Sequence, residues 1–155
     1  MNPIEVYVLS NERSAKVACN FLDNVAPDRS PVAIDFPFPE YCEKPCIVFD
    51  NPNDLIVQLG SRIHETYSIY WDVRHGVSEQ VMLFFTADGG MIVGLGGPLI
   101  STEQALFLLQ KIVEGRFGFV TSGSCPPTSI PEFLSICENS TLENIFYGNF
   151  RPTHQ

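Results

Sequence analysis

The chain has 155 residues, 45% of them hydrophobic, and its 18 acidic against nine basic residues give a formal net charge of −9. This length and apolar content predict a single domain, residues 1–155, with a core of its own and exclude an intrinsically disordered protein. The negative charge argues against nucleic acid and anionic membranes as partners and favours a cationic partner, unless it serves only to keep the protein soluble.

The compartment is indicated by what the sequence lacks and by its cysteines. No apolar run approaches the ~20 residues of a membrane span. The N-terminus has no basic segment followed by an apolar one, so we expect neither a membrane span nor a secretory signal. Five cysteines at irregular spacing favour free thiols over a disulfide framework. We therefore expect a cytoplasmic protein.

The first third of the chain predicts a strand, a helix and a long loop. Residues 4–9 fit a short strand, and Ser10 caps a helix expected over 11–24, whose apolar residues form one stripe. Residues 26–45 contain five prolines and no sustained period, which predicts an ordered loop. The apolar side chains expected to pin this loop are Ile34, Phe36, Phe38 and Tyr41.

Further helices are marked by their caps. After a short strand at 46–49, the pair Asn51-Pro52 begins a helix expected over 52–62. A capping box at Ser101 begins another helix, expected over 102–114. The remaining elements are an edge strand at 117–121, a short helix from Ser129 through Cys137, and an apolar C-terminal segment that docks on the domain.

The strongest strand signal lies in the middle of the chain. Residues 67–73 and 80–87 are rich in aromatic and β-branched side chains. Asp88-Gly89-Gly90 supplies the positive-φ turn of a tight hairpin, and residues 91–95 form the returning strand. We therefore predict an α+β domain with a central antiparallel sheet, built on the hairpin at 80–96, and helices packed on it.

Two placements of the turn give the hairpin the same two faces. A turn at Asp88-Gly89 pairs Phe85 with Ile92, and a turn at Gly89-Gly90 pairs Phe85 with Gly94. One face would then carry Met82, Phe84, Thr86, Met91, Val93 and Leu95. Both faces are apolar, so we expect the centre of the sheet to be covered on both sides.

Strand alternation also separates two aromatic neighbours. Tyr70 and Trp71 point to opposite faces of their strand. Trp71 is in phase with Tyr67 and Ile69 and is the expected core residue, which leaves Tyr70 for a more exposed position near a sheet end.

Two features are candidates for ligand binding or catalysis. Gly94–Pro98 stands between a predicted strand and a helix, as a phosphate-binding turn does, but Leu99 occupies the third glycine position of the dinucleotide pattern. The alternative role for these glycines is close packing. Cys125 could act as a nucleophile with His64 or His75, although nothing in the sequence marks a base beside it. Cys42 and Cys46 have a spacing within the zinc-finger range, but a zinc site needs four ligands, and no other cysteine, histidine or acid has a partner spacing. We therefore expect neither metal nor cofactor.

Acidic residues gather on the predicted loops and element ends. Three of them surround Tyr41 on the long loop, where an aromatic anchor with acids around it would select a basic partner. The alternative is that they are solvated charges on exposed turns. The predicted partner-binding residues are Asp35, Glu40, Tyr41, Glu43, Asp54, Asp72 and Glu79.

A family resemblance lies in the central block. Tyr70-Trp71, followed by Phe84-Phe85-Thr86-x-Asp88-Gly89-Gly90 and Gly94-Leu95, resembles immunity proteins of bacterial polymorphic toxin systems, including those of contact-dependent growth inhibition. The resemblance covers about thirty of the 155 residues. It implies a cytosolic, non-enzymatic α+β protein that binds and blocks a cognate toxin domain, often a nuclease. Because a nuclease needs a basic groove for phosphates, the acidic charge of this chain agrees with that implication.

Three classes of function remain open from the sequence. The first is an immunity-type inhibitor that occludes a basic toxin surface. The second is an enzyme or small-ligand protein that uses Gly94–Pro98 or Cys125. The third is an adaptor with no toxin partner.

Overall fold

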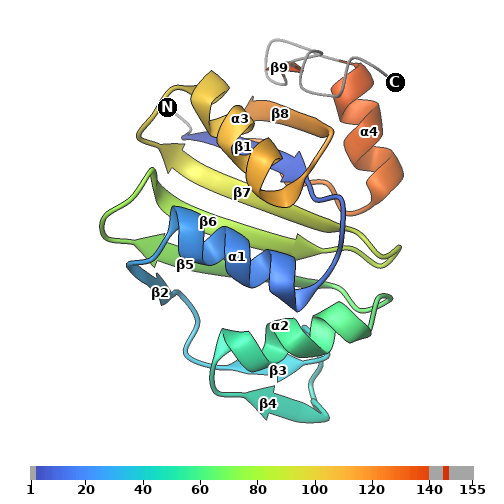
Figure 1. Ribbon diagram of the computed structural model, residues 1–155. Coiled ribbons are helices and arrows are strands. Elements are labelled where there is room, and N and C mark those ends of the chain that lie inside the picture. Colours follow the sequence, from blue (N-terminus) through green and yellow to red (C-terminus); the bar gives the residue numbers. More distant parts are fainter. Residues whose placement is uncertain (1–2, 140–144, 147–155) are drawn as a thin grey trace.

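The computed structural model describes residues 3–139 and the backbone of 145–146, and the chain forms an α+β domain (Figure 1). The strands are β1 (Ile4–Leu9), β2 (Arg29–Pro31), β3 (Phe36–Phe38), β4 (Ile47–Phe49), β5 (Tyr67–Val73), β6 (Ser78–Phe85), β7 (Met91–Pro98), β8 (Phe117–Ser122) and β9 (Ile145–Phe146). The helices are α1 (Ala15–Val25), α2 (Pro52–Ser61), α3 (Thr102–Val113) and α4 (Ile130–Glu138).

The strands form one large antiparallel sheet and one small one. The large sheet has the order β2-β5-β6-β7-β1-β8-β9, and the small one joins β3 to β4. Every pairing is antiparallel. The predicted fold class is therefore confirmed, although 117–121 is not an edge, because β8 lies between β1 and β9.

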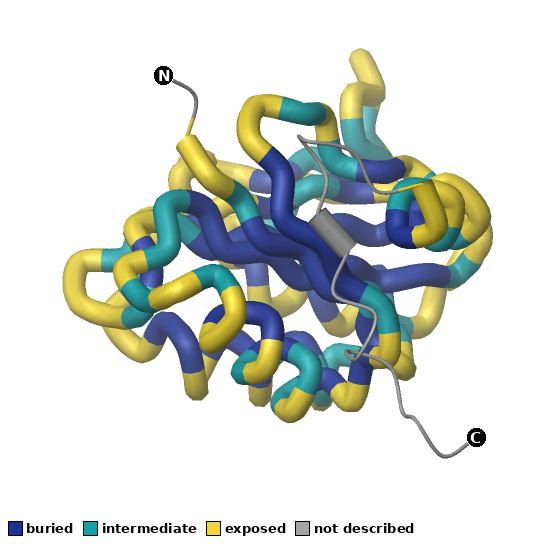
Figure 2. Tube along the Cα trace, turned by 90° about the horizontal axis from the view of Figure 1, so that it is seen from above, coloured by how far each residue is buried: buried dark blue, intermediate teal, exposed yellow. Residues whose placement is uncertain are grey.

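Helices cover the large sheet on both faces, as its apolar faces require. Helices α1 and α3 pack on one face, and α2 packs against α1 and the small sheet; together they give a core that includes Phe21, Leu59 and Leu109. On the other face α4 packs on β8, with Phe133 and Cys137 buried. The buried strands form a continuous slab through the middle of the molecule (Figure 2). Trp71 is 1% exposed and Tyr70 is 37% exposed, as strand alternation predicts.

The register of the central hairpin differs from both predicted ones. Phe85 pairs with Met91, and Thr86 donates its backbone N–H to the Gly90 carbonyl at 3.0 Å. The loop is therefore Ala87-Asp88-Gly89, with Gly89 at φ 88°, which is the left-handed residue of a three-residue hairpin loop. Three loop residues in place of two shift the pairing by one, so Phe85 shares a face with Met91, and the predicted division of the two faces is wrong.

The N-termini of the helices are set by side-chain caps. The α2, α3 and α4 caps are Asn51, Ser101 and Ser129, and at α3 the full capping box with Gln104 is present. Helix α1 begins later than predicted, because Ser14 accepts the cap hydrogen bond from Val17. The predicted cap, Ser10, instead hydrogen-bonds with Glu12 in the preceding turn.

Residues 26–45 are more structured than the predicted loop. They include β2, which pairs with the edge of β5, and β3, which pairs with β4. Phe36 and Phe38 are buried and anchor the segment, as predicted. Ile34 and Tyr41 are 94% and 90% exposed, so the prediction that they pin the loop is wrong.

The longest helix among the described residues is α3, with 12 residues. In that part of the chain, no helix has both the length and the apolar character that crossing a bilayer requires.

Candidate functional site

A groove runs beside the first half of β5, where β2 no longer pairs with it. Its volume is about 270 Å³. Six of its lining residues define what is here termed the tyrosine groove: Asp35, Glu40, Tyr41, Tyr67, Ser68 and Tyr70. Three of these are predicted site residues, and the fold brings them against two tyrosines of β5.

Polar contacts hold the proline-rich segment against the strand. The carboxylate of Glu40 accepts the backbone N–H of Ser68 at 3.0 Å through Oε2. The hydroxyl of Tyr67 donates to the Pro37 carbonyl at 2.8 Å, and the N–H of Val32 donates to the Tyr70 carbonyl at 3.0 Å. The segment thus covers the β5 edge that β2 leaves open, and its acids stay beside the tyrosines.

The groove has a negative electrostatic environment. Burial, together with the negative charges of Glu40 and Asp35, raises the pKa of Tyr67 to about 12. Burial also raises the pKa of Tyr70, with contributions from Tyr41 and Glu40. Burial raises the pKa of the Glu40 carboxyl, and the Ser68 N–H partly offsets this. Among the described residues no arginine or lysine lines the groove, so they supply no partner that neutralises its negative charge there.

Tyr41 projects from the groove into solvent. It has a φ of 61°, which a bulky side chain rarely adopts, and is 90% exposed. Neither packing nor backbone preference therefore favours tyrosine at this position. Such residues persist where the surrounding structure fixes them, often at binding sites.

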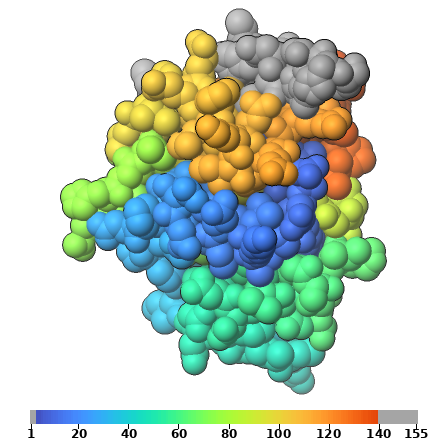
Figure 3. Space-filling model, in the orientation of Figure 1, coloured from blue at the N-terminus to red at the C-terminus, as the bar shows by residue number. Residues whose placement is uncertain are grey.

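The surface around the groove is both apolar and acidic. Exposed apolar side chains occur on the groove segment, on β4, which pairs with β3, and on β5. They are Val32, Ile34, Ile47, Val48 and Tyr70. Residues 32–54 carry five acids and one base. The chain from β3 through α2 forms the lower end of the molecule, drawn light blue to green in Figure 3. Exposed apolar side chains and acids therefore occur together along residues 32–54.

The other predicted site residues are not in the groove. Glu43 is exposed on the same segment. Asp54 accepts a hydrogen bond from Asn51 Nδ2 at 3.2 Å and supports the α2 cap. Strand alternation places Asp72 on the face that carries Tyr70, and Glu79 on the opposite face, beside Gly97. Sequence reasoning did not assign Tyr67 to the site, although its place in an aromatic strand next to acids was visible.

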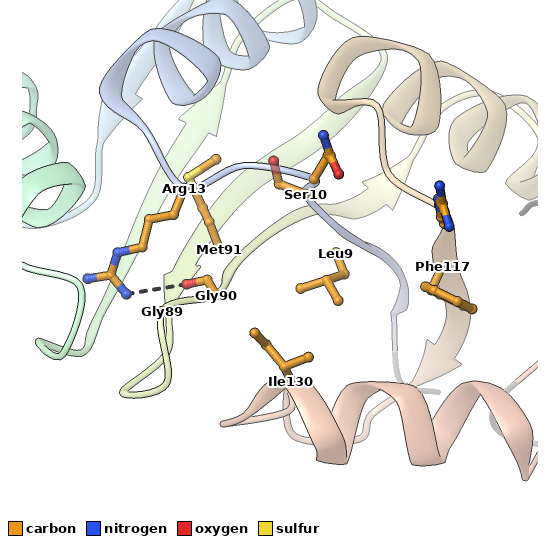
Figure 4. A pocket seen from close by; sticks show the side chains of 10 residues that line it. Leu9, Ser10, Arg13, Gly89, Gly90, Met91, Phe117 and Ile130 are labelled. Carbon is orange, nitrogen blue, oxygen red and sulfur yellow. Dashed lines mark hydrogen bonds between the residues drawn. The ribbon is translucent and has the colours of Figure 1, made fainter.

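A second cavity, of about 250 Å³, lies where β1 ends and β7 begins (Figure 4). The apolar side chains of Leu9, Met91 and Ile130 line it, and Arg13 extends from its wall. The Arg13 guanidinium donates five hydrogen bonds of 2.7–3.4 Å to the backbone carbonyls of Leu59, Arg62, Glu65, Thr86 and Gly90. Its donors are all used, so this arginine joins α1, α2 and the hairpin rather than offering a binding group.

The glycine-rich segment at 94–98 is part of a strand and not a turn. Strand β7 continues to Pro98, and a side chain at Gly94 would approach the Tyr7 ring to 2.8 Å. Tyr7 lies over Gly94 and makes aromatic contacts with Phe84 and Phe119 at ring distances of 5.8 and 5.5 Å. Close packing therefore accounts for Gly94, which is the alternative to a phosphate-binding turn that the sequence left open.

The thiols and imidazoles do not form a common centre in the described residues. Cys125 is exposed between β8 and α4, and no base among the described residues is hydrogen-bonded to its thiol. Cys137 is buried, and burial raises the pKa of its thiol to about 12. Within the described ranges, no three metal-binding side chains come together.

Comparison with protein-family models, with curated proteins and with solved structures finds no match for this chain. The site is therefore described from its own geometry.

Proposed function

We propose that this protein is an immunity-type inhibitor that binds a cognate, cationic toxin domain through the tyrosine groove and the acidic surface around it. The observation that carries the proposal is the convergence of Asp35, Glu40 and Tyr41 with Tyr67 and Tyr70 in a groove to which the described part of the chain contributes no arginine or lysine. Tyrosines supply rigid contact area, and surrounding acids select a basic partner.

The proposed mechanism is occlusion and requires no catalytic residue. A nuclease binds phosphates through a basic surface, which an acidic protein can cover. The net charge of −9 would speed the encounter, and the exposed apolar residues around the groove would slow dissociation. The immunity-protein resemblance of the central hairpin points to the same class of partner.

A pull-down from the source cell followed by charge reversal tests the proposal. Asp35→Lys and Glu43→Lys change exposed acids on the groove segment, and Glu103→Lys changes an exposed acid of α3, away from the groove lining, as a matched control. We expect each groove-side variant to lower the affinity for the partner about tenfold, equivalent to ~1.4 kcal/mol, and the control to leave the affinity unchanged. Raising salt should slow association of the wild type. Equal affinities for all three variants, with no salt dependence, would show that the acids serve only solubility.

A further inference from the structure

We propose that the tyrosine groove receives one arginine side chain of the partner, with its guanidinium against the Tyr41 and Tyr70 rings and paired with Glu40. The inference rests on the proposed function, because the toxin domain would supply this arginine. It names the chemical group that the groove recognises.

The size of the groove favours a side chain over a small-molecule ligand. Its volume of about 270 Å³ lies below the range of ~300–1,000 Å³ in which drug-sized ligands are enclosed. It is also open along one side, where Tyr41 stands 90% exposed. A long side chain that enters from a protein surface fits such a site.

The polar groups of the groove favour a cation. Glu40 uses Oε2 to accept the Ser68 N–H, and its Oε1 has no hydrogen bond among the described residues. Asp35 adds a second carboxylate, and Lys44, the only base in residues 32–54, does not line the groove. An entering cation would therefore pair with carboxylates that have no basic partner among the described residues.

The tyrosines favour guanidinium over ammonium. A guanidinium is planar, stacks on aromatic rings and still donates in its own plane to a carboxylate. An ammonium is a strongly hydrated point charge that loses more solvation when it enters such a site. Tyr41 and Tyr70 supply the rings, and Glu40 supplies the acceptor.

Titration of the ¹⁵N-labelled protein with Nα-acetyl-arginine amide tests the inference, with the lysine and citrulline amides as comparisons. The amide of Ser68 is the local reporter, because it donates to Glu40. Ligands of this size bind at roughly millimolar affinity. We expect saturable shifts at Ser68 and Tyr70 with arginine, at least about fivefold weaker binding of lysine, and no binding of citrulline, which lacks the charge.

Two variants and a control locate the binding. Glu40→Gln keeps an oxygen for Ser68 but removes the charge, and Tyr41→Asn removes the ring at a φ that asparagine tolerates. We expect arginine binding to fall about tenfold and about fivefold respectively, and to be unchanged in Glu103→Gln, which changes an exposed acid of α3 that does not line the groove. Absence of saturable shifts, equal binding of citrulline, or wild-type binding by both variants overturns the inference. If the arginine amide does not bind but Asp35→Lys still lowers the affinity for the toxin domain, the proposed function stands and this inference alone is wrong.

Discussion

Replacing Arg13 tests the account of how the helical layer is joined to the central hairpin. Its hydrogen bonds to Leu59, Thr86 and Glu65, at 2.7–2.9 Å, are partly buried, whereas the Arg62 carbonyl is exposed and can bind water instead. A hydrogen bond to a charged group contributes about 1.5–3 kcal/mol, so three at the low end give roughly 4–5 kcal/mol. Partial solvent access reduces this, and we expect Arg13→Met to lower the free energy of unfolding by about 3–4 kcal/mol.

Arg13→Lys separates charge from geometry. A lysine keeps the charge but has three donors at a single point, so it can reach the α2 end or the hairpin but not both. We expect this variant to lose about 2 kcal/mol. Urea unfolding followed by circular dichroism measures both losses, and an unchanged m-value would show that the folded and unfolded states keep their compactness.

The matched control is Arg116→Met, at an exposed position whose side chain makes no hydrogen bond or ion pair with the described residues. We expect this control to stay within about 0.5 kcal/mol of the wild type. The thermal midpoint of Arg13→Met should fall by roughly 6–12 °C. If Arg13→Met and Arg116→Met lose the same stability, the carbonyl contacts contribute nothing and the reasoning is refuted.

Three further predictions concern the hairpin, the sheet and the groove. The Thr86 hydroxyl lowers the pKa of Asp88 below its ordinary value of 3.8, so the stability lost in Asp88→Asn should be present above about pH 4 and vanish as acid protonates Asp88; a difference that persists at pH 2 contradicts this. Gly94→Ala places a methyl group against the Tyr7 ring and should cost about 1–3 kcal/mol in urea unfolding; no loss would mean that the ring moves freely. Tyr41→Asn should leave the free energy of unfolding unchanged or raise it by up to about 1 kcal/mol, and it should lower the affinity for the partner. A clear loss of stability would instead make Tyr41 a structural residue.

The central hairpin shows how far periodicity determines a sheet. Aromatic and β-branched runs located β6 and β7, and Asp88-Gly89-Gly90 located the turn between them. The pairing of Phe85 with Met91 was missed, because a single extra loop residue reverses which side chains share a face. The sequence allows loops of two and three residues here, and the contacts that the Thr86 hydroxyl and the Asp88 carboxylate make with the loop and with Ile130 favour the longer one.

The candidate site was only partly visible before folding. Acids and aromatics on a proline-rich segment marked Asp35, Glu40 and Tyr41, because an aromatic anchor with acids around it is typical of a surface that selects a basic partner. Their meeting with Tyr70 depends on the segment lying along the β5 edge, which no local pattern specifies. Arg13 left no signal either, since the carbonyls that it binds come from segments 46–77 residues away.

By itself the sequence determined the fold class, the positions of most helices and strands, and the acidic character of the surface, because alternation, caps and charge are local properties. The tertiary structure alone decided the hairpin register, the role of Arg13 and the joining of distant acids and tyrosines in one groove. Each of these depends on contacts between segments far apart in the chain, whose partners are fixed only when the sheet has formed and the helices have packed on it.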